Sequence, residues 1–386
     1  MPLLSVVFKG KRDSGIWEHR KNNNEENDLR SLSGGVNTWC DTGNDNILDS
    51  IGSICQHVPE KAEQIIVELS EDTPGLIRQM AEIISPDICV VSDIDKSHIE
   101  FYGSEANIVN EFSTALACLS SEGVCITNCD NDNNRSLSTD KKMIFVSMKD
   151  TSADYYADNI QVDLEGMRFK IIEKATGISH KIRLYHVYAL HNVYSAMLAF
   201  AAGVQIGLSY DTIIKGLSNY RPSGFRQNIY RSGKTIIYAD CFNAVAKSVK
   251  SAILAANQIP VTGRRIAVLG DVAEAGAYTE STHSEIVDIV NNSEFTILMT
   301  CGQELRRALE KANVRNNLTV FTFDTQTEMN KMLKKQTHNG DLVLFKSSHS
   351  GNLSQSIRTV FPVAYFIQMV KYYVPRVKWH FKVLMN

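Results

Sequence analysis

The sequence lacks an excess of charge of either sign. Its 386 residues contain 40 Lys and Arg against 43 Asp and Glu, which gives a formal net charge of −3 and a pI near 6.4. A protein that attracts nucleic acid through its overall electrostatic field needs a surplus of basic residues. The composition excludes such an attraction, and we expect no nucleic-acid partner.

Cysteine is scarce as well, with eight residues in the chain and no C-x-x-C pair. Eight cysteines are too few for a disulfide scaffold in a protein of this length. Cys125 and Cys129 have the spacing of a metal clip, but no second pair accompanies them. We therefore expect free thiols, which are typical of the reducing cytoplasm.

Long hydrophobic runs are also missing. The longest apolar stretch, residues 360–370, is interrupted by Pro362 and Gln368. It falls short of the ~20 residues that a membrane-spanning helix needs. The apolar stretch at the start of the chain is shorter than that of a secretory signal. We expect a cytoplasmic protein without a membrane span.

The chain does have the composition of a globular protein, with 44% hydrophobic and 22% charged residues. Short apolar runs alternate with stretches of helical periodicity, which predicts an α/β fold whose parallel sheets are covered by helices. The expected strands of the first half are 65–69, 88–91 and 124–126, followed by β structure over 143–187 and a helix over 191–203. A second α/β unit has expected strands at 235–238, 265–269, 295–299, 320–323 and 342–345.

The expected domain boundary lies near residues 220–224, which read Tyr-Arg-Pro-Ser-Gly. We expect a central, parallel-sheet, ATPase-like domain over 1–220, although its first 50 residues show no clear periodicity. A Rossmann-like C-terminal α/β domain is expected over 221–358. Residues 359–386 form a basic and aromatic extension, and its segment 361–386 contains no acidic residue. This segment suits a membrane surface, a protein partner or simple packing.

Polar residues follow the predicted strands, at the sheet edge where α/β proteins bind ligands. Glu68 ends the 65–69 strand, and His98 lies in the loop after the 88–91 strand. If these strands are neighbours, the carboxylate and the imidazole converge and could hold a divalent cation that bridges nucleotide phosphates, although Mg²⁺ prefers oxygen ligands. The alternative is a surface glutamate and an unrelated histidine.

Three further polar residues have two readings each. Asn192 either caps the helix that begins near His191 or reads the edge of a base with its amide. Arg226 is a turn residue or a clamp for phosphate oxygens. Asp240 follows the 235–238 strand, where a carboxylate can accept hydrogen bonds from ribose hydroxyls.

A phosphate-binding loop is poorly represented. Such a loop needs glycines whose N–H groups wrap the phosphate, a lysine, and a Ser or Thr for magnesium. The segment 8–13 supplies only Gly10 and Lys11 of that pattern. Lys11 is the candidate phosphate contact, and a plain basic loop is the alternative.

The order of five segments resembles the Mur ligases, the ATP-dependent amide-forming enzymes of peptidoglycan precursor assembly. The resemblance covers residues 46–356. Its segments are IIVELSEDTPGLIRQMAEIISPDICVVSDIDKSHIEFYGS, YALHNVYSAMLAFAAGVQIGLSYDTIIKGL, RQNIYRSGKTIIYADCFNAVAKSVKSAI, RRIAVLGDVAEAGAYTESTH and DLVLFKSSHSGNL.

This resemblance implies an ADP-forming ligase that joins a carboxylate to an amino acid or peptide amine through an acyl-phosphate, with ATP and Mg²⁺. The positions that match the family's functional residues are Glu68 and His98 for magnesium, Asn192 for adenine, Arg226 for the phosphates, Asp240 for ribose and Asn243 in the same nucleotide loop. Glu68, His98 and Arg226 are the implied catalytic set.

Departures from the family pattern keep a second interpretation open. The family's phosphate loop is not recognisable, Phe112 stands where the family commonly has a lysine, and the sugar-nucleotide-binding domain has no counterpart. The alternative is a catalytically degenerate homologue that binds a nucleotide or a partner subunit. Such a subunit could also supply the sugar-binding domain.

Overall fold

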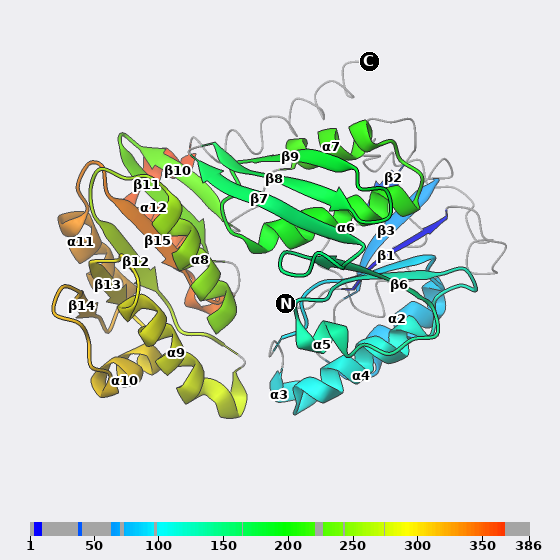
Figure 1. Cartoon of the computed structure of the whole chain (residues 1–386). Coiled ribbons are helices and arrows are strands. Elements are labelled where there is room, and N and C mark those ends of the chain that lie inside the picture. The colour runs from blue at the N-terminus through cyan, green and yellow to red at the C-terminus, as the bar shows by residue number, and fades with distance from the viewer. Residues whose placement is uncertain are drawn as a thin grey trace, which may run out of the picture. The chain divides into compact units, whose positions relative to one another are not determined.

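The structure is a computed structural model, which describes residues 63–69, 73–95, 99–163, 165–220, 227–241, 244–273 and 275–366, together with the backbone of Leu4–Lys9 and Thr38–Cys40. The chain divides into two compact units. The first contains residues 1–161, 168–185 and 191–220, and the second contains 162–167, 186–190 and 221–386. Each unit is built around its own sheet (Figure 1).

The first unit has a mixed sheet flanked by helices. Its described strands follow the order β2-β3-β1-β4-β5-β6-β7-β8-β9. The strands are β1 (Leu4–Lys9), β2 (Thr38–Cys40), β3 (Gln64–Leu69), β4 (Ile88–Val91), β5 (Val124–Asn128), β6 (Lys142–Ser147), β7 (Tyr155–Asp163), β8 (Gly166–Glu173) and β9 (Ser179–Tyr185). The helices are α2 (Leu76–Ile84), α3 (Ile99–Tyr102), α4 (Glu105–Leu116), α5 (Asp132–Arg135), α6 (His191–Gln205) and α7 (Tyr210–Asn219).

The expected parallel sheet is present from β4 to β7, where each neighbouring pair is parallel. Strand β1 departs from this pattern, since it runs antiparallel to both β3 and β4. Its last residue, Lys9, therefore lies opposite Gln64 at the amino end of β3, whereas Glu68 lies opposite Ser5. The carboxyl end of β1 therefore lies at the end of the sheet opposite Glu68.

Helices α2 and α4 cover one face of this sheet, and α6 contacts β4, β5 and β6 from the other face (Figure 1). Buried side chains of β3, β4 and β5 form a single cluster with α2 and α4. Phe112 lies at the centre of this cluster and is 1% exposed, so this position of α4 serves the core.

Helix α2 begins without a side-chain cap of its own. The helix starts at Leu76, after Gly75 in the left-handed conformation with φ 93°. Its amino end is satisfied from another helix, because Glu111 of α4 accepts a hydrogen bond from the Gly75 N–H at 2.8 Å. A tertiary contact thus replaces the local cap, which no local sequence pattern shows.

The second unit has a sheet of five parallel strands, with β10 added antiparallel at one edge of the described part. The order is β10-β11-β15-β12-β13-β14. The strands are β10 (Asn228–Ser232), β11 (Thr235–Asp240), β12 (Arg265–Leu269), β13 (Ile297–Thr300), β14 (Thr319–Thr322) and β15 (Leu342–Lys346). The helices are α8 (Ala246–Gln258), α9 (Thr279–Asn291), α10 (Gln303–Lys311), α11 (Gln326–Gln336) and α12 (Leu353–Val360).

Apolar side chains cover both faces of this second sheet. One buried cluster joins α8, α9 and α10 to the strands, and another joins α11 and α12 to the opposite face. Strand β15 returns to lie between β11 and β12, so the strand order reverses beside it. In doubly wound α/β folds, this kind of reversal marks the edge where ligands bind.

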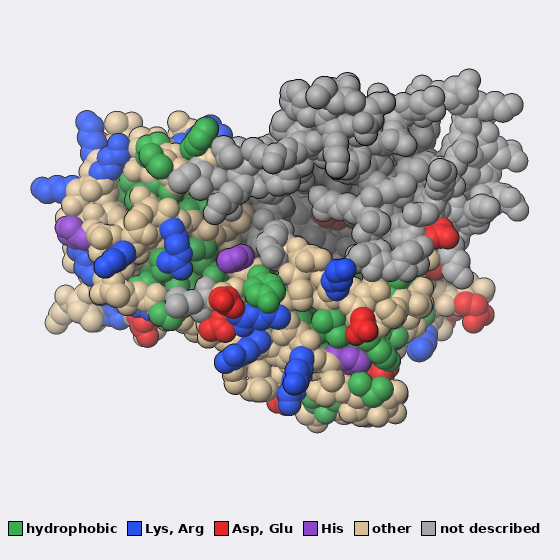
Figure 2. Space-filling model, turned by 90° about the horizontal axis from the view of Figure 1, so that it is seen from above, with side chains coloured by type: hydrophobic (Ala, Val, Ile, Leu, Met, Phe, Trp, Pro, Cys, Tyr) green, Lys and Arg blue, Asp and Glu red, His purple; other side chains and the backbone are tan. Residues whose placement is uncertain are grey.

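The surface carries both signs of charge. Figure 2 shows Lys and Arg side chains together with Asp and Glu side chains on the face in view. None of the helices in the described ranges combines the length and the apolar character that crossing a bilayer requires.

A buried carboxylate fastens the amino ends of β12 and β15. Asp341, whose side chain is 2% exposed, accepts hydrogen bonds from the Arg264 guanidinium at 2.9 Å and from the N–H groups of Arg264 and His338. Burial acts to raise the pKa of Asp341, but these hydrogen bonds outweigh it and hold the pKa below its ordinary value of 3.8.

We expect Asp341→Asn to lower the free energy of unfolding of the second unit by about 2 kcal/mol at pH 7, because hydrogen bonds to a buried charge are lost. The folded-state pKa is depressed, so this stabilisation is complete above the unfolded pKa and disappears as the pH falls through the folded pKa. Hydrogen exchange of the β12 and β15 amides measures the loss, which should shrink in acid.

The exposed carboxylate of Asp324 provides a control, since it also pairs with an arginine at 2.8 Å but is 81% exposed. Asp324→Asn should change the free energy of unfolding measured by hydrogen exchange by less than about 1 kcal/mol at either pH. An Asp341→Asn effect of the same size at pH 7 and in acid would contradict the electrostatic origin of the stabilisation.

Candidate functional site

The carboxyl edge of the second sheet carries a buried ion pair. Asp240 and Lys346 are the last residues of β11 and β15, and they lie opposite each other in the parallel register. Lys346 Nζ is 3.2 Å from Asp240 Oδ2, and the two side chains are 2% and 11% exposed. The expected position of Asp240 at a strand end is therefore observed, with a cation beside it.

The neighbouring strand end is occupied by structural contacts. Asp271 follows β12 and accepts hydrogen bonds from the N–H groups of Glu304 and Leu305 at the start of α10. His283, 1% exposed, accepts from the Val272 N–H with Nε2 at 3.0 Å, so Nδ1 carries the proton that it donates to the carbonyl of Thr279. This loop is thus fixed by its own helices.

Gly302 permits the contact between Asp271 and α10. A Cβ atom at this position would lie 2.1 Å from Asp271 Oδ1. Only glycine lets the amino end of α10 approach the carboxylate so closely.

The carboxyl edge of the first sheet carries several acidic side chains. Glu68 lies near the end of β3 and is half-buried, and Asp93 follows β4. Asn128, at the end of β5, donates its amide to Asp93 at 2.6 Å. Within the described ranges, no three His, Cys, Asp or Glu side chains are grouped so that they could hold a metal ion.

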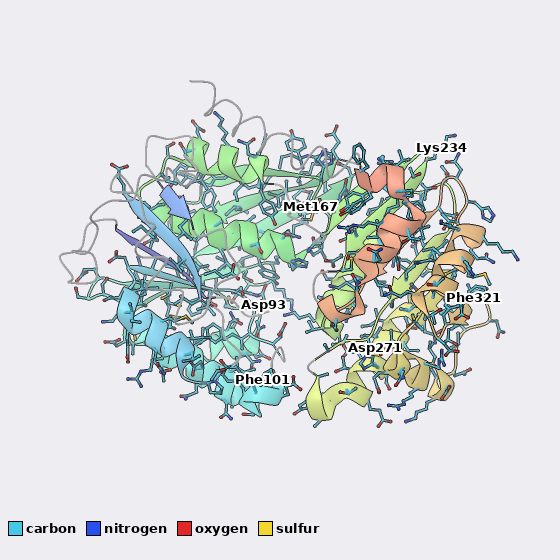
Figure 3. All side chains as sticks on the ribbon, turned by 180° about the vertical axis from the view of Figure 1, so that it is seen from behind. Asp93, Phe101, Met167, Lys234, Asp271 and Phe321 are labelled. Atoms are coloured by element: carbon cyan, nitrogen blue, oxygen red, sulfur yellow. The ribbon has the colours of Figure 1, made fainter. Side chains whose placement is uncertain are left out.

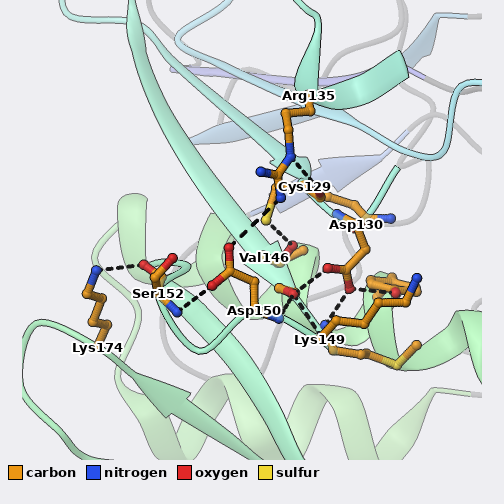
Figure 4. Close-up of polar contacts among 12 residues, drawn as sticks. Cys129, Asp130, Arg135, Val146, Lys149, Asp150, Ser152 and Lys174 are labelled. Atoms are coloured by element: carbon orange, nitrogen blue, oxygen red, sulfur yellow. Dashed lines mark hydrogen bonds and ion pairs between the residues drawn. The ribbon is translucent and has the colours of Figure 1, made fainter. Parts of the chain in front are cut away.

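Asp130, which follows β5, accepts hydrogen bonds from three described residues (Figure 4). It accepts hydrogen bonds from Ser147 Oγ at 2.5 Å, from the Met148 N–H at 2.7 Å and from Tyr194 Oη at 2.7 Å. Burial, the hydrogen bond to Asp130 and the charge of Asp130 together raise the pKa of Tyr194 well above its ordinary value. The phenol therefore stays protonated and keeps donating.

This contact fixes the first turn of α6. Tyr194 lies two residues after Asn192, and both follow His191, where the helix begins. Asn192 is the second residue of the helix and is 8% exposed, so the capping interpretation of this residue is wrong. Its buried amide remains a candidate for reading a base.

A second set of hydrogen bonds holds the loop after β4, which precedes His98 in the sequence. Asn134 is fully buried, and its Oδ1 accepts from the Ile94 N–H at 2.8 Å. Its Nδ2 donates to the carbonyl of Ser92 and to Thr127 Oγ1, each at 2.7 Å. These hydrogen bonds tie the loop after β4 to the end of β5.

The structure describes three of the predicted site residues and not the others. Glu68 and Asp240 lie at the carboxyl ends of β3 and β11, and Asn192 lies at the start of α6. The remaining predicted residues are Lys11, His98, Arg226 and Asn243, which lie outside the described residues.

The phosphate contact predicted for Lys11 stays a prediction, because Lys11 lies outside the described residues. A strand followed by a phosphate loop brings its lysine to the edge where Glu68 lies only if the strand runs parallel to β3. Strand β1 is antiparallel, and its carboxyl end pairs with Gln64. The strand direction therefore does not support a role for Lys11 at the Glu68 edge.

Sequence reasoning missed Asp130 and Tyr194, and it gave Lys346 no partner. The segment from residue 130 is rich in Asn and Asp, a composition that predicts a surface loop. It contains α5 and the fully buried Asn134. The position of Asp130 four residues after the apolar run 124–126 was the available signal.

A surface depression of about 380 Å³ lies elsewhere, against α10 and the end of β14. It is lined by Arg306, Leu309, Glu310, Thr322 and Asp324. None of the predicted site residues lines it, and its charged groups Arg306 and Asp324 already pair with each other.

Comparison with known proteins gives the family. The Mur ligase middle domain matches residues 30–203, and the Mur ligase glutamate ligase domain matches residues 226–349. The UDP-N-acetylmuramoyl-tripeptide–D-alanyl-D-alanine ligase of Bacillus subtilis is 26% identical over 306 residues, which are 78% of this chain and 65% of that protein. The Escherichia coli protein of the same name is 24% identical over 69% of this chain and 59% of its own length.

Solved structures agree on the fold. MurF from Acinetobacter baumannii matches with a TM-score of 0.75 and 21% identity, over 84% of this chain and 70% of that one. MurF ligase from Thermotoga maritima, solved in complex with ADP, matches with a TM-score of 0.73 and 18% identity, over 84% and 73%. The chain spans less than two thirds of the length of the two curated relatives. With both a middle and a C-terminal Mur ligase domain, and with the α/β fold expected of them, the chain belongs to the Mur ligase family.

Proposed function

We propose that this protein is an ATP-dependent, ADP-forming ligase that joins a carboxylate to an amino acid or peptide amine, in cell-wall precursor synthesis. The observation that carries the proposal is the match to both Mur ligase domains in one chain, with relatives named UDP-N-acetylmuramoyl-tripeptide–D-alanyl-D-alanine ligase. The polar residues at the strand ends of both units support it, since α/β folds bind their ligands there.

The residues present fit a magnesium nucleotide. Magnesium is usually held by one or two protein ligands together with substrate phosphates, so a three-residue metal cluster is not needed. Glu68 would be one ligand and His98 the other. The nucleotide itself would be held by Asn192 at the adenine, by Arg226 at the phosphates, by Asp240 at the ribose and by Asn243 in the same loop. Lys11, which lies outside the described residues, stays a candidate phosphate contact without support from the direction of β1.

The proposed reaction has two displacement steps. A carboxylate oxygen of the first substrate attacks the γ-phosphorus of ATP, and ADP leaves. The amine nitrogen of the second substrate then attacks the acyl carbon, inorganic phosphate leaves, and the nitrogen loses its proton. Protein groups contribute mainly by positioning the reactants and by neutralising charge on the transferred phosphoryl group, so Arg226 would act here.

The setting of this reaction is also a proposal. The six cysteines in the described part are free thiols, as expected in the cytoplasm. The substrates would be small molecules, and a partner subunit could supply the sugar-binding domain. The end of the chain, residues 367–386, lies outside the described residues, and its docking role stays a prediction.

We expect Glu68→Ala and His98→Ala each to reduce magnesium-dependent ADP release by about 10²–10³-fold, because each removes charge stabilisation at the transferred phosphoryl group. Release is measured with Mg-ATP over a panel of acyl acceptors and amines. Glu122→Ala, which changes an exposed glutamate, is the matched control and should leave release unchanged.

Thermal unfolding accompanies the assay, since both substitutions lie near strand ends and should leave the fold intact. Loss of folding with unchanged nucleotide affinity in the folded fraction would remove the metal assignment. A wild-type chain that binds ATP but releases no ADP with any substrate pair would support the degenerate homologue instead.

Replacing Asn192 by Ala should weaken ATP binding by about tenfold and reduce the preference for ATP over GTP, because the buried amide no longer reads the base edge. Calorimetric titration with both nucleotides measures the preference. Asn219→Ala, at the exposed end of α7, should not change it. A lowered melting temperature with an unchanged preference would show that Asn192 only supports the packing of α6.

A further inference from the structure

The Asp240–Lys346 pair carries an inference that rests on the proposed function and goes beyond it. Parallel pairing puts the two residues in the same register, at the last position of two adjacent strands. Side chains at matched positions of neighbouring strands project from the same face of a sheet. The contact at 3.2 Å is thus built into the register of β11 and β15 and does not depend on a flexible loop.

The burial of Lys346 requires a polar partner for its ammonium group. The Lys346 side chain is 2% exposed, so its ammonium group needs a partner in place of water. A buried ion pair of this kind is often no more stable than two well-packed apolar residues, yet removing one partner leaves a costly unpaired charge. Stability alone therefore gives little reason for a charged pair at this position.

The geometry also defines what Asp240 can still do. A carboxylate offers about four acceptor sites, so a contact to Lys346 through Oδ2 leaves acceptor capacity for ligand hydroxyls. Among the residues at this edge, Asp271 already accepts two backbone hydrogen bonds from α10. The observed partner of Asp240 is instead the side chain of Lys346, at the end of the neighbouring strand.

We propose that Lys346 is a positioning residue that orients the Asp240 carboxylate toward the sugar hydroxyls of the bound nucleotide, and that the pair thereby sets the preference for ribonucleotides over deoxyribonucleotides. Lys346 fixes the rotamer of Asp240 through the contact with Oδ2. The carboxylate then accepts hydrogen bonds from the ribose, which a sugar lacking the hydroxyl cannot supply.

The test compares the affinity of the full chain for ATP, 2′-deoxy-ATP and 3′-deoxy-ATP by calorimetry. The wild type should prefer ATP over at least one deoxy analogue by about tenfold or more, which corresponds to the hydrogen bond of a hydroxyl to a charged acceptor. Lys346→Met and Asp240→Asn should each bring this ratio close to one. Lys346→Arg, which keeps a cationic donor, should retain most of the preference.

The double variant Asp240→Asn/Lys346→Met separates positioning from stability. It replaces the buried charges by two neutral side chains, so it should fold even if Lys346→Met alone does not. Because Lys346 acts through Asp240, the double variant should show the same ratio as Asp240→Asn and no additional loss. Thermal melting of each variant is recorded beside the titrations.

The control is Lys234→Met. Lys234 is exposed in the turn before β11, at the end of the sheet opposite Asp271 (Figure 3), and its removal should leave the ratio unchanged. A folded Lys346→Met or double variant that keeps the wild-type preference overturns the inference while the proposed function stands. A wild type that binds ATP without any preference has the same consequence. A wild type that binds no nucleotide overturns the proposed function and this inference together.

Discussion

Parallel strand pairing is the constraint on which both candidate sites depend. When neighbouring strands run in the same direction, their last residues collect at one edge, together with the loops that follow them. The register of β11 against β15 brings Asp240 to Lys346, and the register from β4 to β6 brings Asp93, Asn128 and Asp130 to one edge. Apolar interiors on both faces of the strands hold these registers, since a slip of one residue would move each buried side chain to the other face.

Polar residues at these edges are useful only if the loops that carry them are held in place. The structure achieves this by satisfying buried polar groups across elements. Asn134 joins the loop after β4 to the end of β5, and Asp130 joins the loop after β6 to the first turn of α6. These hydrogen bonds stabilise the fold, because a polar group that is buried without a partner would carry a free-energy penalty. The residues that would touch a ligand are therefore supported by residues that do not.

The sequence was most informative where a local pattern decides the structure. Apolar runs located the strands of both units, and the α/β fold class was predicted correctly, because burial on two faces needs continuous apolar residues. Strand β10 was missed, since its exposed edge position leaves a weak pattern. The position of Glu68 and Asp240 at strand ends followed directly from where their apolar runs stop.

Contacts between distant segments were not visible in the same way. The direction of β1 depends on its pairing with β3 and β4, and a single apolar strand has no pattern that encodes direction. The cap of α2 comes from Glu111, 36 residues away. Asn-rich sequence after β5 was taken for a loop, although Asn134 is buried, because composition records polarity and not partners.

The direction of β1 and the absence of a recognisable phosphate loop both concern how the phosphates of the nucleotide would be bound. In the proposed reaction, charge on the transferred phosphoryl group must be neutralised by fixed donors or cations. Glu68 and the carboxyl end of β1 lie at opposite ends of the sheet, so the direction of β1 does not by itself bring such donors to Glu68. Glu68, Asp240 and Asn192 stand at positions that the resemblance assigns to the magnesium nucleotide, whereas the segment 8–13 lacks the pattern of a phosphate loop. Nucleotide recognition and phosphoryl transfer thus make separate demands on this sequence, and retention of the first does not by itself guarantee the second.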